Sequence, residues 1–209
     1  MFHALLAIQP VAIEMLNDME FRPLTPDRWD DLVDLFGPER GANSGCWCMW
    51  PLLRAKDWQA MAREERRDAF HNRVSIGSEP GLLGYHDKPA ICWVAVGPRE
   101  NYVRFQMSRT TRPLEEDTRD QIRKTYALTC FFVRKGFRNS SLMWQLIKAA
   151  SIHAKSKGAH YLDACPIETD KPLQWGEGFV GIASVFRRCG FEEVARRSPR
   201  RPLMRLRLT

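Results

Sequence analysis

Three basic side chains stand between an apolar run and an amphipathic segment near the middle of the chain. The run covers residues 125–133, and the basic residues that follow it are Arg134, Lys135 and Arg138. Because the run is short and rich in aromatic and β-branched residues, it predicts a buried strand. Cationic groups at the end of such a strand would hold an anion, such as a pyrophosphate, beside the start of the next element.

That next element is predicted to be a helix. Residues 139–141 read Asn-Ser-Ser, all of which favour helix N-termini, and apolar residues then recur at helical spacing from Leu142 to Ala154. Two lysines and Gly158 follow as stop signals. Free backbone N–H groups at the start of this helix carry partial positive charge, so they add to the pull of the basic turn on an anion.

Two common phosphate-binding designs do not fit this turn. A nucleoside-triphosphate loop requires Gly-Lys-Ser or Gly-Lys-Thr after a glycine-rich turn, and Gly136-Phe137-Arg138 does not supply it. A dinucleotide site requires three spaced glycines, whereas Gly136 is the only glycine in the turn. Both classes are therefore excluded.

A third design matches in register. Phe132-Val133, then Phe137-Arg138, then the helix from Leu142 resemble the coenzyme A turn of the GNAT acetyltransferases. The resemblance extends over residues 21–208, since residues 21–36, 160–166 and 184–194 look like the opening strand and helix, a later strand, and the last helix with its following strand. Residues 46–49 (Cys-Trp-Cys-Met) and 179–186 are similar to segments of one GNAT subgroup.

The resemblance implies an α/β GNAT fold, with helices around a mixed, mostly antiparallel sheet, in a domain of residues 20–209 after an N-terminal extension of residues 1–19. It implies an N-acetyltransferase that moves an acetyl group from acetyl-CoA to a primary amine by direct attack. The co-substrate would lie between the strand ending at Val133 and the strand ending near Pro166. Metal is not expected.

The resemblance also implies roles for individual residues. The backbone of Phe131, Phe132 and Val133 would hold the pantetheine arm, and the pyrophosphate would bind to the N–H groups of Arg138, Asn139, Ser140, Ser141, Leu142 and Met143. Glu168 and Asp163 would lie beside the thioester and relay a proton, or they would be solvated or paired. Ser184, at the head of the last helix, would contact the coenzyme or simply cap the helix.

Three positions depart from the family pattern and keep a second function open. Ser141 and Met143 stand where small residues usually let the backbone approach the pyrophosphate, and Phe186 stands where many members carry a proton-donating tyrosine. The alternative is a noncatalytic acyl-CoA-binding or protein-interaction module on the same fold.

The segment Gly45-Cys46-Trp47-Cys48-Met49-Trp50 has two interpretations. Trp47 and Trp50 would form aromatic walls of an acceptor pocket, suited to an apolar or cationic acceptor. The other interpretation is a hydrophobic loop that packs on the core. Zinc is not favoured, because Cys-x-Cys supplies two ligands and no second pair with metal spacing is visible.

The composition is that of one globular domain. The chain has 209 residues with 44% hydrophobic and 27% charged residues, six cysteines and a net charge of +7. The cysteines mostly lie in apolar patterns, which favours a reducing, cytoplasmic location. The positive charge alone does not indicate nucleic acid, since no nucleic-acid motif accompanies it, and the N-terminal stretch is too short to span a bilayer. A homodimer remains open.

The remaining segments of the chain are predicted to form the elements that position the site residues. Residues 58–74 predict one exposed helix, and residues 82–85 and 90–96 predict a hairpin around His86-Asp87-Lys88-Pro89. Residues 99–123 show no periodicity and predict a long loop or substrate lid. Residues 204–208 alternate apolar and basic side chains, which predicts a final strand with one solvated face.

Overall fold

A seven-stranded sheet with the order β1-β2-β3-β4-β5-β7-β6 forms the centre of the chain. The computed structural model describes residues 19–37, 41–138, 142–174 and 176–208. Among the strands of this sheet, β4 and β5 pair in parallel, and all other neighbours are antiparallel. The predicted mixed, mostly antiparallel sheet is confirmed. Its strands are β1 (Glu20–Pro23), β2 (Gly81–Tyr85), β3 (Ala90–Pro98), β4 (Thr125–Val133), β5 (Tyr161–Ala164), β6 (Glu192–Ala195) and β7 (Leu203–Arg207).

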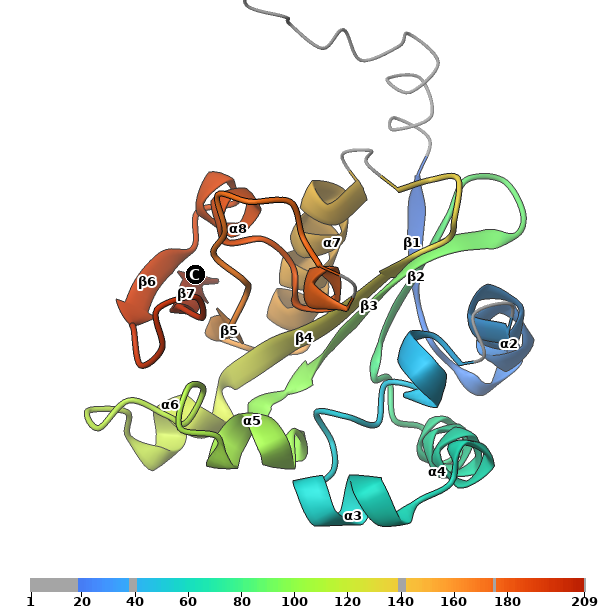
Figure 1. The fold of residues 1–209 in the computed structure, drawn as a ribbon, viewed down its shortest axis with the longest axis horizontal. Helices are drawn as coiled ribbons and strands as arrows, with labels where there is room; N and C mark the ends of the chain where they lie inside the picture. The colour runs from blue at the N-terminus through green and yellow to red at the C-terminus, as the bar shows by residue number, and fades with distance from the viewer. Residues whose placement is uncertain (1–18, 38–40, 139–141, 175, 209) are drawn as a thin grey trace, which may run out of the picture.

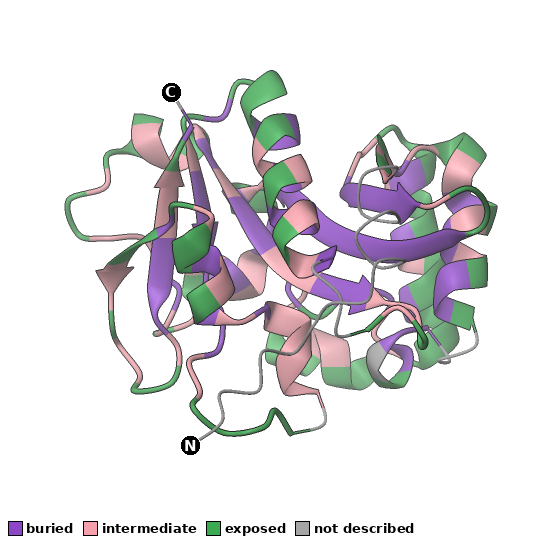
Figure 2. Cartoon of the chain, turned by 90° about the horizontal axis from the view of Figure 1, so that it is seen from above, coloured by how far each residue is buried: buried purple, intermediate pink, exposed green. Residues whose placement is uncertain are grey.

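Helices cover both faces of this sheet (Figure 1). Buried side chains of α2 (Trp29–Phe36) and α4 (Arg63–Ser75) share one core with β2, β3 and β4. On the other face, α7 (Leu142–Ser156) and α8 (Ala183–Arg188) share a second core with the strands. The central strands are therefore buried from both sides, as Figure 2 shows, and this explains the continuous apolar run in β4.

The segments that carried the strongest local pattern fold as expected. The predicted strand of residues 125–133 is β4, residue for residue, and the predicted helix is α7, which ends before Gly158 at φ +82°. The hairpin of β2 and β3 is present, as are the predicted strands β5, β6 and β7. Residues 1–18 lie outside the described part of the chain, so the extension is not placed.

The single helix predicted for residues 58–74 is wrong, because two helices share this stretch. They are α3 (Ala55–Ala60) and α4, and between them Met61 has extended backbone angles of φ −85° and ψ 134°. The side chain of Glu65 accepts the N–H of Ala62 at 2.6 Å and so starts α4. Arg66 then donates back to the carbonyl of Met61 at 2.7 Å, which fixes the corner.

The long loop predicted for residues 99–123 is also wrong. This stretch forms a 3₁₀ turn (Arg99–Asn101) and the short helices α5 (Val103–Met107) and α6 (Arg119–Arg123). The first residue of the stretch, Arg99, explains why it is held in a regular structure. The Arg99 side chain is 1% exposed and pairs with Asp163 on β5, which is fully buried.

Asp163 is the centre of a buried charge network. Besides Arg99 it accepts from Arg205, the residue directly opposite it on β7, at 2.7 Å, and Arg205 also binds Asp117 at 2.7 and 2.9 Å. Hydrogen bonds from Arg205 and from the Leu114 N–H lower the pKa of Asp117 against the effect of its burial. The network ties residues 99–117 to the C-terminal half of the sheet.

Removing the central carboxylate should destabilise the fold strongly. Asp163→Ala leaves the Arg99 guanidinium buried without a counter-charge, which is expected to cost about 3–5 kcal/mol in urea unfolding. Asp57→Ala, which breaks the surface pair with Arg54, is the control and should cost less than about 1 kcal/mol. Equal costs for the two variants would show that the buried network does not anchor this region.

Candidate active site

The two parallel strands at the centre of the sheet, β4 and β5, pair over four residues and then separate. Pairing between β4 and β5 runs from Thr125–Tyr161 to Leu128–Ala164 and then stops. At the same point the register between β3 and β4 shifts, so that Cys130 faces Ala95 while Leu128 faces Val96, and Thr129 is the extra residue. Such a bulge bends a strand and turns its side chains and backbone toward new partners.

Beyond the bulge, one edge of β4 is open. The N–H of Arg134 donates to Ile91 at 2.8 Å, which makes this a hydrogen-bonded pair of the β3–β4 ladder. Because such pairs alternate, Phe132 also faces β3, whereas Phe131 and Val133 turn their N–H and C=O groups away from it. No backbone group of another described strand pairs with these two residues, so their N–H groups and the Phe131 carbonyl are available along this edge, whereas the Val133 carbonyl accepts from Arg138.

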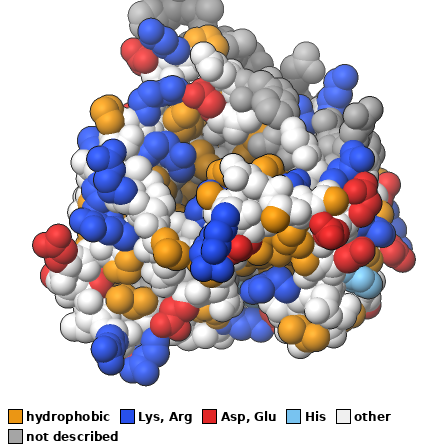
Figure 3. Space-filling model, turned by 60° about the horizontal axis from the view of Figure 1, so that its bottom comes forward, with side chains coloured by type: hydrophobic (Ala, Val, Ile, Leu, Met, Phe, Trp, Pro, Cys, Tyr) orange, Lys and Arg blue, Asp and Glu red, His pale blue; other side chains and the backbone are white. Residues whose placement is uncertain are grey.

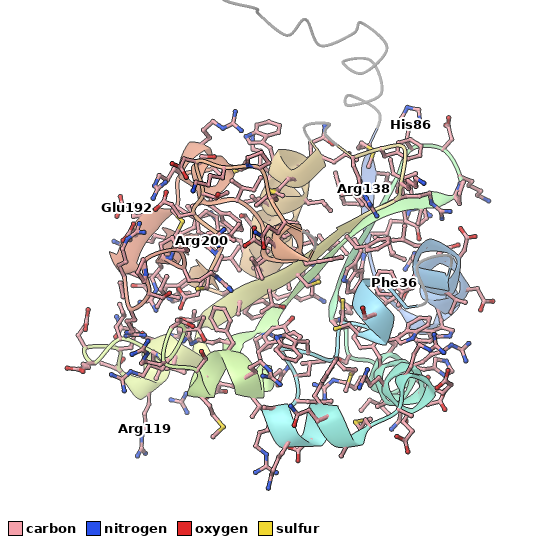
Figure 4. All side chains as sticks on the ribbon, in the orientation of Figure 1. Phe36, His86, Arg119, Arg138, Glu192 and Arg200 are labelled. Atoms are coloured by element: carbon pink, nitrogen blue, oxygen red, sulfur yellow. The ribbon has the colours of Figure 1, made fainter. Side chains whose placement is uncertain are left out.

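A basic turn closes the far end of the open edge. Arg138, labelled in Figure 4, donates through Nε to the carbonyl of Val133 at 3.0 Å, and Gly136 adopts φ +99° in the same turn. Arg134 is committed elsewhere, since it binds Asp34 at 2.6 Å and the carbonyl of Ala90. Lys135 is exposed.

The start of α7 follows this turn. Leu142 is buried and Met143 is half-buried, and both pack with the second core. The predicted contacts at Asn139, Ser140 and Ser141 lie outside the described residues.

A cavity of about 750 Å³ opens where the strands part. It lies between β4, the chain after β5, and the two segments around residues 50–56 and 104–111. Figure 3 looks at this side of the molecule, where Lys and Arg side chains gather around a hollow that contains hydrophobic side chains. The lining residues used below are Trp50, Lys56, Arg104, Thr129, Cys165 and Arg201.

Thr129 is one of the residues that line this cavity. Its oxygen is shielded from bulk solvent, and it lies near the Tyr102 hydroxyl without meeting the geometry of a hydrogen bond. Burial raises the pKa of Tyr102, so that phenol stays neutral. A buried hydroxyl without a partner in the described chain is suited to bind an atom of a ligand.

Glu168 is paired with two arginines, and Ser184 lies on the surface of α8. The Glu168 carboxylate binds Arg187 at 2.5 and 2.9 Å and also Arg196, and these hydrogen bonds lower its pKa to about 2. It is thus a poor proton acceptor, which corrects the expected relay. Ser184 is exposed at the second position of α8, whose N-cap is Ile182, so it is not the cap either. Neither residue lines the cavity.

The two tryptophans predicted as pocket walls have different positions. Trp47 is 5% exposed and stacks on Trp29 with ring centroids 6.1 Å apart. Its ring covers Gly41 so closely that a Cβ there would meet the indole nitrogen at 2.2 Å. Trp47 is therefore a core residue, which corrects that prediction. Trp50 is 46% exposed and lines the cavity.

Phe186 and Asp163 also belong to the interior. Phe186 is fully buried and meets Phe131 and Phe191 edge to face, with centroids 5.9 and 4.9 Å apart. Asp163 is paired within the charge network described above, which is the second of the two alternatives that the sequence left open.

Sequence reasoning missed most of the cavity. Thr129, Arg104 and Arg201 carried no motif, because each enters the site through a bulge or a loop whose position depends on distant residues. Cys165 was assigned to the core, and it is indeed buried although it also lines the cavity. Burial raises the pKa of its thiol, so it is no thiolate nucleophile near neutral pH.

The described residues show neither a metal-binding cluster nor a membrane-spanning helix. They contain no cluster of three or more His, Cys, Asp or Glu side chains arranged to hold a metal ion. None of their helices combines the length and apolar character needed to cross a membrane.

Comparison with known proteins identifies the architecture. No protein-family model and no curated protein matches the sequence. Among solved structures, yncA of Salmonella typhimurium, assigned as an acetyltransferase and solved with its cofactor acetyl-CoA, superposes with a TM-score of 0.52 at 13% identity, over 92% of this chain and 95% of that one.

Two other solved structures agree. An N-acetyltransferase from Staphylococcus aureus superposes with a TM-score of 0.51 at 13% sequence identity, over 91% of this chain and 99% of that one. The GNAT domain of PAT from S. lividans superposes with a TM-score of 0.52 at 14% sequence identity, over 91% of this chain and 90% of that one. At these identities the shared property is the architecture, and the chain has the fold of the GNAT acetyltransferases.

Proposed function

We propose that this protein transfers an acetyl group from acetyl-CoA to a primary amine. The observation that carries the proposal is the open edge of β4, which leads from the basic turn to the cavity at Thr129. A similar fold in yncA holds acetyl-CoA, which supports the choice of co-substrate.

In this proposal the co-substrate lies along β4. The N–H groups of Phe131 and Val133 and the carbonyl of Phe131 bind the amides of the pantetheine arm, as a further strand would. The turn with Arg138 and the first N–H groups of α7 bind the pyrophosphate. The thioester then lies at the bulge, beside Thr129 and within the cavity that receives the acceptor.

The reaction is a direct displacement. The neutral amine nitrogen forms a bond to the acetyl carbon and then loses a proton, the carbon–sulfur bond breaks, and coenzyme A leaves as a thiolate that takes up that proton. The attacking amine must first lose its own proton, and the described wall of the cavity contains no Asp, Glu or His to accept it. Water is therefore the proposed acceptor, and the protein contributes mainly by holding the two reactants together.

The Thr129 hydroxyl is the proposed hydrogen-bond donor at the thioester. Phe186 has no proton to give and is fully buried, so the charge that develops on the oxygen or sulfur needs another partner. Thr129 lies at the bulge with a shielded hydroxyl beside that of Tyr102, and a donor held in place in this way is most effective.

Calorimetric titration with acetyl-CoA, followed by an assay of coenzyme A release with a panel of amines, tests the proposal. We expect saturable binding and turnover with at least one amine. Arg138→Ala should weaken binding about tenfold, since a charge-assisted contact to phosphate is lost. The control is Arg119→Ala on α6, an exposed arginine that points away from the sheet in Figure 4 and should bind normally.

Each other result has a distinct meaning. The proposal fails if the parent protein does not bind acetyl-CoA. Binding without turnover across the panel would instead support a noncatalytic acyl-CoA-binding module.

Replacing the cavity hydroxyl should slow the chemical step. Thr129→Val keeps the size and β-branching but removes the donor, so we expect kcat to fall about 10²-fold with little change in the Kd for acetyl-CoA. Thr129→Ser is the matched control and should retain most activity. Equal activity of the Val and Ser variants would remove Thr129 from the mechanism.

The pH dependence should follow the acceptor rather than the protein. Because only the neutral amine attacks, kcat/KM is expected to rise about tenfold per pH unit below the pKa of the amine and then level off. The midpoint should move when an amine of different pKa is used. Glu168→Gln should give the same profile, and a midpoint that is fixed for all amines but lost in this variant would restore Glu168 as a base.

A further inference from the structure

The charged side chains on the described wall of the cavity are all cationic. Trp50 and Phe105 supply part of its apolar surface, and the charged residues that line it are Arg54, Lys56, Arg104 and Arg201. Arg54 is neutralised by Asp57 at 2.7 Å. The other three have no carboxylate partner within the described residues. A concave surface with uncompensated positive charge favours an anion.

Arg104 is the most specific of these groups. Its guanidinium lies over the Trp50 ring, 3.6 Å from the ring centroid, and its Nε donates to the Trp50 carbonyl at 2.9 Å. One terminal nitrogen, Nη2, is buried without a hydrogen-bond partner in the described chain. Burial also lowers the pKa of Arg104, as expected where no anion compensates the charge. A guanidinium held in place without a counter-charge is suited to bind a carboxylate or a phosphate.

Arg201 brings a second positive charge to the point where the strands part. Its Nε and Nη2 donate to the carbonyl of Cys165 at 3.2 and 2.7 Å, which holds the side chain at the end of β5. Lys56 adds an exposed ammonium group near the opening. The positive charge therefore extends from the outer wall to the bulge.

The phosphates of the co-substrate do not account for this charge. In the proposed pose they bind at the turn after Val133, whereas the cavity begins at Thr129. Four residues of extended strand separate these points by about 13 Å, and the thioester end of the co-substrate carries no anionic group. The anion must then belong to the acceptor.

We propose that the acceptor is a primary amine that also carries an anionic group, a carboxylate or a phosphate, on a partly apolar body. This inference rests on the proposed acetyl transfer. The amine lies at the bulge and attacks the thioester, while the anion binds to Arg104 and Lys56 and takes no part in bond making. Trp50 and Phe105 contact the apolar part. This assignment replaces the apolar or cationic acceptor expected from the tryptophans alone.

Matched pairs of acceptors test the inference. Phenylalanine is compared with phenethylamine, which lacks only the carboxylate, and phosphoethanolamine with ethanolamine. We expect kcat/KM, corrected for the fraction of neutral amine, to favour one anionic member by about 10- to 100-fold, the range for hydrogen bonds to charged groups. The preferred pair tells carboxylate from phosphate.

Two variants connect the preference to the cavity. Arg104→Met keeps the apolar stem over Trp50 but removes the charge, and it should reduce the preference to within about threefold of unity, chiefly through a lower kcat/KM for the anionic acceptor. Lys56→Met, at an exposed position where misfolding is not expected, should reduce it partially. Arg119→Met is the charge-matched control away from the site and should keep the full preference.

A binding experiment separates this inference from the proposed reaction. Hydrocinnamate, which has the carboxylate but no amine, is titrated into the parent protein in saturating coenzyme A, beside hydrocinnamyl alcohol and inorganic phosphate. Binding of either anion that is lost in Arg104→Met supports an anionic pocket even if no amine turns over. If neutral amines are used as well as anionic ones and neither anion binds, the inference is overturned, whether or not acetyl transfer occurs.

Discussion

The short pairing between β4 and β5 is the constraint on which the rest of this structure depends. Two parallel strands in the middle of a sheet normally satisfy each other along their whole length, yet here the pairing stops at Leu128 and a bulge at Thr129 follows. Backbone groups that would otherwise complete the sheet are thereby left for a ligand. The cavity, its hydroxyl and the open edge all result from this one interruption.

An opening in the middle of a sheet weakens it, and the buried charges on β5 compensate at the neighbouring strands. Asp163 joins Arg205 across the β5–β7 pair and holds Arg99 at the end of β3. The segment that begins at Arg99 is therefore fixed at its base while its outer part forms a wall of the cavity. The same network positions Arg104 and Phe105, which line the cavity.

Elements with a strong local pattern were predictable, and groups placed by distant contacts were not. The patterns that predict β4 and α7 lie in consecutive residues, so the bounds of both elements could be predicted from the sequence. Arg99 looked like a loop residue because its partner lies 64 positions away. Trp47 looked like a pocket wall, but it adopts φ +46° and is held against Gly41 by packing that no spacing reveals. The cationic wall was missed for the same reason.

The basic turn and the cavity lie at opposite ends of the open edge of β4. This separation has a kinetic consequence. In the proposed arrangement, the coenzyme enters past Arg138 and the acceptor enters past Lys56, so neither blocks the route of the other. Both substrates are then present together when the acetyl group moves, and no acetylated protein need accumulate between two half-reactions. The proposed arrangement therefore implies sequential rather than ping-pong kinetics.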